Sequence, residues 1–277
     1  MSDLDAAVVQ TWLYPVKSMQ GNLVDVLDVR HGGVVGDRNW ALFDLNAGRV
    51  LSAKLAGRLL DAIVESDTIT LPTGETLSIA ECVNGGECEP LSEWLERPIR
   101  LCSVDDISEL GDGHLTYQMT FDPPNDDSEY YDIPMPEGSF VDLAPMHLLT
   151  TATLDGCAAA RPDLNWDVRR FRPNVLVDVE GERFIESAWT GKPIGIGDDL
   201  VIEVAQATVR CAMPLRHQPP LDPGSDPAAD PLPELASQPS LYQAMNELRP
   251  DMPNHLGVYV NVLEPGQVRV GDRLRFV

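Results

Sequence analysis

Cys211 and the residues beside it are the part of the chain best suited to chemistry. Cys211 follows Arg210 at the end of residues 200–210, where apolar and polar side chains alternate as in a half-buried strand. The next stretch, residues 217–239, is rich in proline and aspartate and cannot form a strand or a helix. Positive charge beside a thiol favours the thiolate, which binds metals and attacks electrophiles. The local sequence supports equally well a structural role, in which Cys211 is a small buried hydrophobic residue.

Three basic residues at predicted strand ends could accompany that thiol. Lys17 follows the first predicted strand, Arg38 precedes the strand predicted at residues 40–44, and Arg172 precedes a strand that starts near residue 174. Each alone is explained by a surface salt bridge with one of the many carboxylates. Together they predict an anion site, because loops at strand ends converge on ligands and a guanidinium binds phosphate at two points.

Polar residues near these cations extend the candidate site. Asn174 carries an amide whose donors and acceptors suit the edge of a heterocycle. Thr150 and Thr151 stand at the start of a predicted helix, where backbone N–H groups can bind an anion. Plain N-capping is the alternative role for these threonines.

The other cysteines and the histidines give weaker signals. The chain has five cysteines, and neither their odd number nor their spacing forms a disulfide framework. Cys82 and Cys88 flank a predicted turn, while Cys102 and Cys157 are expected to be buried. No cysteine or histidine pair follows at zinc spacing, and His147 lies in an apolar run and is expected in the core.

Composition limits the classes of function. The 277 residues, 43% of them hydrophobic, can bury a sizeable core, and the formal net charge is −24. So acidic a surface repels nucleic acid and anionic membranes, so neither is expected as a partner. No run approaches the ~18 apolar residues that span a bilayer, and the start lacks the features of a signal peptide. We therefore expect a cytoplasmic protein.

Short strands separated by turns dominate the pattern. Strands are predicted at residues 8–14, 24–29, 40–44, 68–71, 174–179 and 200–210, with two alternating strands joined at residues 264–266. Hairpins are predicted over residues 42–51 and 70–77, and short helices over residues 91–95, 150–161 and 241–248. This favours an α+β, mainly β class, rich in β-barrel and with a few short helices. The acidic, proline-rich residues 121–138 indicate a boundary between two domains, residues 1–125 and 126–277.

Several motifs occur in the order found in a known family. The chain resembles proteins with a MOSC domain preceded by the MOSC N-terminal β-barrel domain, the group that includes the mitochondrial amidoxime reducing component and its bacterial relatives. The motifs that carry the resemblance are YPVKS (Lys17, Ser18), GDRNW (Arg38), FVDLAP (Asp142, Pro145), RFRPNVLVD (Arg172, Asn174), FIESAW (Glu186, Trp189), VRCAMP (Arg210, Cys211) and QVRVGD (Gly271, Asp272).

The resemblance implies a cofactor and a reaction. It implies a molybdenum–pyranopterin cofactor held by cations and polar side chains, with Cys211 as the protein ligand to the metal. The residues implied to hold the cofactor are Lys17, Ser18, Arg38, Arg172, Asn174 and Arg210. The implied enzyme is a molybdenum-dependent oxidoreductase that reduces a small N-hydroxylated substrate, with electrons from a separate donor protein.

Three other functions remain open from the sequence. Cys211 could carry a persulfide in sulfur transfer, without molybdenum. The protein could be a non-catalytic carrier of the molybdenum cofactor, or an acidic binding module with an incidental cysteine. The sequence departs from the family where Ala212-Met213-Pro214-Leu215-Arg216 replaces a threonine-rich stretch, which leaves the substrate unspecified.

Overall fold

The structure is a computed structural model. It describes residues 3–54, 56–84, 86–109, 116–119, 131–135, 139–216, 218–219 and 239–277. The predicted domain boundary at residues 121–138 and the loop at residues 217–239 lie largely outside these described residues.

A closed barrel of seven strands forms the larger part of the molecule. Strand order around it is β1, β14, β13, β17, β16, β15 and β19, with β19 pairing back to β1 and β2 attached outside the ring along β1. The pairs are antiparallel except for β13 and β14, which are parallel. The fold is therefore mainly β with a few short helices, as the sequence predicts. The seven barrel strands are β1 (Asp3–Leu13), β13 (Met146–Thr150), β14 (Val175–Val179), β15 (Pro193–Ile196), β16 (Leu200–Val209), β17 (His255–Glu264) and β19 (Arg273–Phe276), and the strand outside the ring is β2 (Asn22–Val24).

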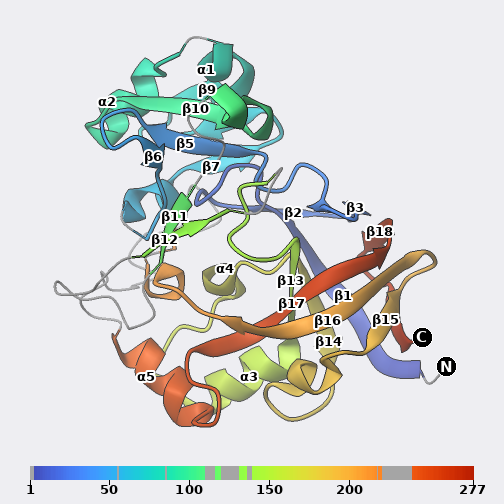
Figure 1. The fold of residues 1–277 in the computed structure, drawn as a ribbon. Coiled ribbons are helices and arrows are strands. Elements are labelled where there is room, and N and C mark those ends of the chain that lie inside the picture. Colours follow the sequence, from blue (N-terminus) through green and yellow to red (C-terminus); the bar gives the residue numbers. More distant parts are fainter. Residues whose placement is uncertain are drawn as a thin grey trace.

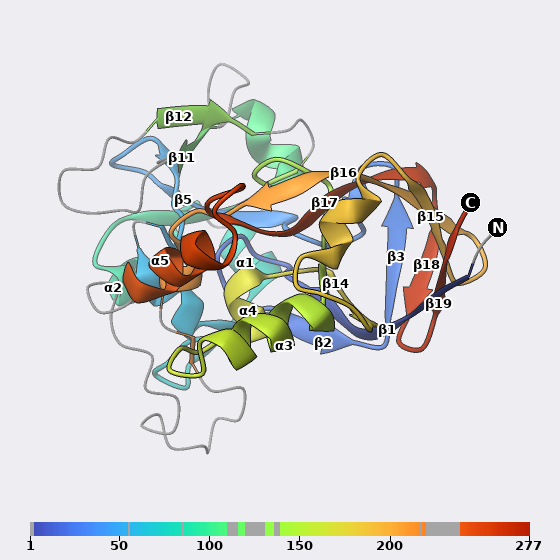
Figure 2. The same cartoon turned by 90° about the horizontal axis from the view of Figure 1, so that it is seen from below.

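Strand β1 closes this barrel although it lies far from the other barrel strands in sequence. It pairs with β14, where Val8 lies opposite Val177, and with β19, where Asp3 lies opposite Arg275. The two termini consequently lie side by side at one end of the barrel (Figures 1 and 2). The division into domains 1–125 and 126–277 stays a prediction, but the first strand of the chain is shared with the barrel of the second half.

Smaller sheets and two helices lie beyond one end of the barrel (Figure 1). These sheets are β10–β5–β6, β7–β8–β9 and β11–β12, whereas the sheet β18–β3–β4 lies beside the barrel and contributes Leu27, Val29 and Val268 to its core. Helices α3 and α5 lie at the opposite end of the molecule from α1 and α2 (Figure 1). These elements are β3 (Val26–Arg30), β4 (Gly33–Val34), β5 (Trp40–Asp44), β6 (Arg49–Val50), β7 (Ile63–Glu65), β8 (Thr68–Thr70), β9 (Thr76–Ser78), β10 (Ile99–Ser103), β11 (Thr116–Met119), β12 (Tyr131–Pro134), β18 (Gly266–Arg269), α1 (Ile79–Asn84), α2 (Glu89–Leu95), α3 (Thr151–Ala160), α4 (Val168–Phe171) and α5 (Pro239–Leu248).

Most sequence-predicted elements are confirmed. The hairpin expected over residues 42–51 is β5 and β6, and the one over residues 70–77 is β8 and β9. The expected final strand is instead two strands, β18 and β19, because the chain turns at Gly271, whose φ of +95° favours glycine. Strand β18 then pairs with β3, while β19 joins the barrel.

Separate hydrophobic clusters hold the parts together. The barrel interior is filled by aliphatic side chains such as Val177, Ile202 and Val260, all with no exposed surface. A second cluster fills the space under the small sheets, and Met213 and the partly buried Cys211 pack against it. The segment after β16 therefore reaches from the barrel into the core of the amino-terminal part.

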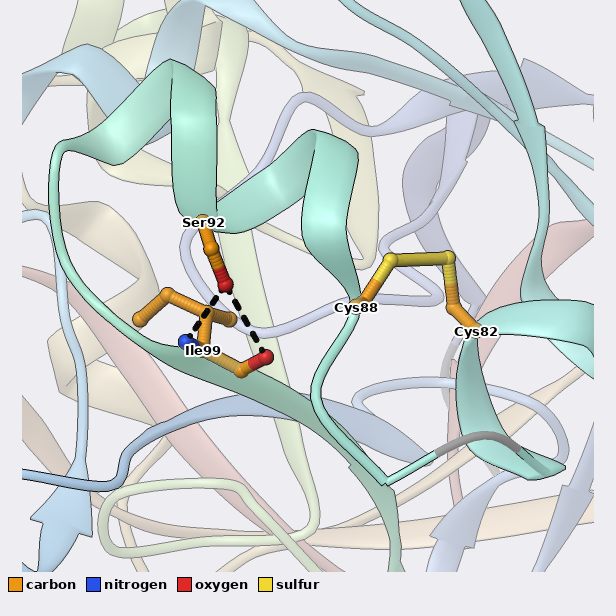
Figure 3. Close-up of a disulfide and its surroundings, with 4 residues drawn as sticks. All are labelled: Cys82, Cys88, Ser92 and Ile99. Atoms are coloured by element: carbon orange, nitrogen blue, oxygen red, sulfur yellow. Dashed lines mark hydrogen bonds between the residues drawn. A yellow bond between two sulfur atoms is a disulfide. The ribbon is translucent and has the colours of Figure 1, made fainter.

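Cys82 and Cys88 form a disulfide between α1 and α2 (Figure 3). Their Cα atoms lie 5.1 Å apart, within the range of disulfides. The prediction of no disulfide framework did not foresee this pair, because the end of α1 and the start of α2 bring together positions that the sequence shows only as flanking a turn. The Ser92 side chain binds the Ile99 backbone nearby, which joins α2 to β10 (Figure 3).

Helices of the described part of the chain are all too short or too polar to cross a bilayer.

Candidate functional site

Cys211 lines a pocket of about 110 Å³ where the barrel meets the small sheets. The pocket walls come from segments far apart in sequence: the loop after β1, the turn before β5, the segment before β13, the end of α4 and the end of β16. Residues that line it include Lys17, Ser18, Arg38, Ser52, Lys54, Asp142, His147, Arg172, Asn174, Arg210, Cys211, Met213 and Tyr259.

Positive charge is concentrated in this pocket. Five cationic side chains line it, and Asp142 is the one carboxylate among its described lining residues. The cations are Lys17, Arg38, Lys54, Arg172 and Arg210. Since the whole chain carries a formal charge of −24 from 44 acidic and 20 basic residues, this clustering runs against the overall charge of the protein. The pocket is therefore suited to an anionic ligand.

Asp142 joins the two lysines. Its carboxylate accepts a hydrogen bond from Lys17 Nζ and another from Lys54 Nζ at 2.8 Å. Burial opposes ionisation of Asp142, but the two lysines outweigh it and hold its pKa below the usual range. Burial lowers the pKa of Lys17, whereas Asp142 and then Cys211 outweigh burial at Lys54 and raise its pKa. Lys54 therefore stays a cation next to the thiol.

Two arginines approach the pocket from separate loops and stack on one ring. The guanidinium carbons of Arg38 and Arg172 lie 4.4 and 4.2 Å from the ring centroid of Tyr14. Arg38 is paired with Asp37, and Arg172 donates from Nη1 to the Met19 carbonyl at 2.7 Å. Burial, and then repulsion from Arg38, lowers the pKa of Arg172 to about 10, so that it remains charged at neutral pH.

The backbone around Cys211 is held by two neighbours. Arg210 Nη2 donates to the Phe171 carbonyl at 2.8 Å, which ties the end of β16 to the end of α4. The Tyr242 hydroxyl, on α5, donates to the carbonyl oxygens of Arg210, at 2.6 Å, and of Cys211. A short 3-10 turn, Met213–Leu215, then packs the chain into the core. Contacts before and after Cys211 in the chain thus hold the backbone that carries the thiol.

Cys211 differs from the other free cysteines of the described residues. Cys102 and Cys157 are buried, whereas Cys211 is partly exposed and lines the pocket. Burial raises the pKa of the Cys102 thiol to about 11 and that of Cys157 to about 12, so both stay protonated. Only Cys211, among these three, can present sulfur to a ligand.

Asn174 lines the pocket, but its amide is also engaged in joining strands. Its Oδ1 accepts from the His147 N–H at 3.2 Å, and its Nδ2 donates to the Trp12 carbonyl at 3.4 Å. It therefore ties β1 to the start of β13, and one amide N–H is left for a ligand. The expectation that His147 is a core residue is confirmed by its burial, although it also lines the pocket.

Thr150 and Thr151 are not brought to this pocket. The Thr150 hydroxyl caps α3 by accepting from the Thr153 N–H at 3.2 Å and donates to Glu186 at 2.8 Å. Thr151 donates to Asp178 at 2.8 Å on an exposed surface. The helix start at which the sequence predicts an anion site faces the buried carboxyl of Glu186, and neither threonine lines the pocket of Cys211.

The structure adds pocket residues that the sequence analysis did not select. Lys54, Ser52 and Tyr259 line the pocket, and Tyr242 supports it from behind. Lys54 is one of only three lysines in a chain with 44 acidic residues, and this scarcity could have marked it as a candidate site residue. No local pattern marks Tyr242, because its contact with Cys211 joins residues 31 positions apart.

Two buried arginine N–H groups at the pocket are available to a ligand. Arg172 Nη2 and Arg210 Nε are buried and have no hydrogen-bond partner within the described structure. Buried N–H groups are almost always paired, so two such atoms on cations that line one pocket indicate an acceptor-rich ligand. An anionic pyranopterin with oxygen and nitrogen acceptors fits this donor set. Among the described residues, no group of three or more histidine, cysteine or carboxylate side chains is placed to hold a bare metal ion.

The site loops adopt costly backbone conformations. Ser18, Arg38 and Arg172 have φ values of 70°, 49° and 52°, in the left-handed region that residues other than glycine rarely adopt. Each costs of order 1–3 kcal/mol and persists only where surrounding contacts impose it. All three line the pocket, so the fold imposes these conformations where the ligand would bind.

Two family models match parts of this chain. Residues 136–275 match the MOSC domain, and residues 5–82 match the MOSC N-terminal beta barrel domain. The chain belongs to the MOSC domain family, a class of domains associated with binding of the molybdenum cofactor.

Its curated relatives are distant. The chain is 25% identical to mitochondrial amidoxime-reducing component 1 of Mus musculus over 96% of this chain and 80% of that protein. It is 23% identical to the Homo sapiens protein of the same name over 96% of this chain and 81% of that protein. Among solved structures, the YUAD protein from Bacillus subtilis matches with a TM-score of 0.42 and 12% identity over 97% of this chain and 93% of that chain. This structural match adds no argument about function.

Proposed function

We propose that this protein is a molybdenum-cofactor-dependent oxidoreductase that reduces small N-hydroxylated compounds. One observation carries the proposal: a partly exposed thiol, Cys211, lies in a pocket lined by five cations in an otherwise acidic protein. The names of the curated relatives support the choice of reaction, since both are amidoxime-reducing components.

The residues that line the pocket have different roles in binding the cofactor. Lys17, Arg38, Arg172 and Arg210 offset its negative charge, and Ser18 and Asn174 offer neutral hydrogen bonds. Cys211 provides a soft sulfur ligand for the metal. When bound, the molybdenum centre supplies the two-electron oxygen-atom transfer that reduces the substrate.

The chain itself positions these groups. Tyr242 holds the backbone carbonyls of Arg210 and Cys211, so the thiol stays at the pocket wall. Asp142 keeps the ammonium groups of Lys17 and Lys54 in place, and burial of these side chains excludes water from their contacts. In this proposal a separate donor protein supplies the electrons. The cytoplasmic location of the protein described here remains a prediction.

Metal content together with turnover tests the proposal. Protein purified from a host that makes the cofactor should contain near-stoichiometric molybdenum and pterin, and should reduce an amidoxime when given a chemical reductant. Cys211→Ser should abolish turnover with an unchanged unfolding temperature, because the thiolate ligand is lost while the partly exposed site tolerates a hydroxyl. Cys102→Ala, at a buried thiol away from the pocket, is the control and should retain turnover.

Other outcomes would select another function. Molybdenum without turnover would make the protein a cofactor carrier, and sulfane sulfur on Cys211 without molybdenum would make it a sulfur transferase. Reduction of the amidoxime by Cys211→Ser at the wild-type rate would rule out the proposed role of the thiol.

A further inference from the structure

Three motifs that are far apart in sequence meet on one aromatic ring. Tyr14 follows β1, Arg38 precedes β5, and Arg172 ends α4. Both guanidinium carbons lie within about 4.5 Å of the Tyr14 ring centroid, at 4.4 and 4.2 Å. We propose that Tyr14 is the positioning residue for the two anion-binding arginines, through the face of its ring and not through its hydroxyl. This inference rests on the proposed function, because it assigns a ligand-binding role to Arg38 and Arg172.

The two arginines need such a support because the site brings like charges together. Asp37 pairs with Arg38, while Arg172 is repelled by Arg38 and attracted by the carboxylates of Asp37 and Asp142. The repulsion is visible in the pKa of Arg172, which burial and then Arg38 lower to about 10. The negative face of an aromatic ring attracts a cation, most strongly when both are removed from water. A single buried ring therefore stabilises both charges without adding a carboxylate that would repel an anionic ligand.

The ring is held rigidly enough to act as a platform. The Tyr14 N–H donates to Asp37 Oδ1 at 2.9 Å, and the Tyr14 carbonyl accepts from the Arg38 N–H at 2.7 Å. Its hydroxyl donates to the Pro173 carbonyl at 3.2 Å, and Trp12 stacks beside it with 6.2 Å between ring centroids. The ring is 1% exposed and lies so close to Gly21 that a Cβ there would fall 2.3 Å from it.

The stacking leaves ligand-binding atoms available. Arg172 uses Nη1 for the Met19 carbonyl, while Nη2 is buried without a partner and Arg172 lines the pocket. Arg38 uses Nη1 for Asp37 and places Nη2 only 3.5 Å from the Arg172 carbonyl, which is a weak contact. The Arg172 guanidinium is thus fixed by the ring and a backbone carbonyl, and the Arg38 guanidinium by the ring and the Asp37 carboxylate. Both still offer donors to an anion.

Two substitutions separate the ring from the hydroxyl. Tyr14→Phe keeps the aromatic face and loses the Pro173 contact, whereas Tyr14→Leu keeps apolar volume and loses the face. The unloaded protein is titrated with inorganic phosphate in a calorimeter, and molybdenum and pterin content is measured after expression in a host that makes the cofactor. Tyr14→Phe should stay within about twofold of wild type, and Tyr14→Leu should bind phosphate about tenfold more weakly and retain less cofactor.

Three results would overturn the inference. A folded Tyr14→Leu with wild-type phosphate affinity and cofactor content would show that the ring does not position the arginines. A Tyr14→Phe as weak as Tyr14→Leu would assign the role to the hydroxyl. If Tyr14→Leu fails to fold, NMR of the wild-type protein decides: the side-chain protons of Arg38 and Arg172 should be shifted upfield by the ring, and unshifted protons overturn the stacking.

Failure of this inference is distinguishable from failure of the proposed function. If the wild-type protein takes up no molybdenum but binds phosphate, and Tyr14→Leu weakens that binding, then the positioning role stands and the reductase proposal falls. If molybdenum loading and turnover are unaffected by loss of the ring, then the reductase proposal stands and the positioning role falls.

Discussion

At the scale of single residues, the pocket is organised by shared partners. Asp142 pairs with two lysines, and the ring of Tyr14 contacts two arginines. The Tyr242 hydroxyl donates to the carbonyls of two successive residues. Sharing reduces the negative charge needed to keep the cations in place. It leaves five cations against one lining carboxylate, which is the property that an anionic ligand requires.

Loss of the Asp142 carboxylate should destabilise the protein in a pH-dependent way. Asp142→Asn removes the carboxylate that two buried ammonium groups share, a loss of about 3 kcal/mol for a buried pair. Because the folded pKa of Asp142 is depressed, its stabilisation is complete above the unfolded value of about 3.9 and is lost as the pH falls through the folded value.

Urea unfolding from pH 7 to pH 3 measures this effect. The gap in unfolding free energy between wild type and Asp142→Asn should be full near pH 6–7 and should start to close only at about pH 4. The exposed ion pair between Asp28 and Arg30 provides the control. Asp28→Asn should change the unfolding free energy by less than about 1 kcal/mol at any pH. A pH-independent gap for Asp142→Asn would contradict the charge pairing.

At the scale of elements, strand ends and tight contacts between strands position the site. Arg210 and Cys211 leave the end of β16, and β16 is held by its long antiparallel pairing with β17. Gly257 in β17 faces His147 in β13, and it has a φ of +78°. A close approach of these two strands places His147 in the pocket wall, so the glycine affects the site without lining it.

Replacement of Gly257 should test this close approach. A Cβ at Gly257 would lie 2.2 Å from His147 Nε2 and 3.0 Å from the Leu148 carbonyl. Gly257→Ala should therefore lower the unfolding free energy by about 3 kcal/mol, since it adds a clash to the positive-φ cost of 1–2 kcal/mol. Gly74→Ala is the matched control, because its φ is +85° and no atom lies within 4 Å of the added Cβ. Equal losses in thermal unfolding of the two variants would show that the contact with His147 is unimportant.

At the scale of the whole molecule, the barrel depends on the first strand of the chain. Strand β1 fills the gap between β14 and β19, and without it both would be unpaired edges. The loop after β1 carries Lys17 and Ser18 to the pocket, so barrel closure and site assembly are one structural event. The two family matches, residues 5–82 and 136–275, are therefore parts of one structure joined through β1.

A fragment of residues 139–277 should fail to fold by itself. It lacks β1, so we expect no cooperative thermal transition by circular dichroism. Adding residues 3–13 behind residue 277 through a short turn should restore a cooperative transition, because Asp3 lies opposite Arg275 and β1 would pair with β19 as a hairpin. Cooperative unfolding of the unmodified fragment would show that the barrel closes without β1.

The sequence by itself determined the local structure and most of the chemistry. Alternating apolar residues predicted β16 and most of β17, because side-chain period is a local property of a strand. It also selected Lys17, Arg38, Arg172, Arg210 and Cys211, all of which line the pocket. These residues stand at strand ends, where the change from an alternating pattern to a proline- or glycine-containing loop is visible in the sequence.

Only the tertiary structure decided how those residues are combined. The stacking of Tyr14 under Arg172, the bridge from Asp142 to Lys54, the pairing of Cys82 with Cys88 and the closure of the barrel by β1 appear in no local pattern. It also separated Thr150 and Thr151 from the pocket by turning their helix toward Glu186. The physical reason is that these contacts depend on the pairing of distant strands, as where Tyr14 meets Pro173 across 159 positions, and local periodicity carries no information about such pairing.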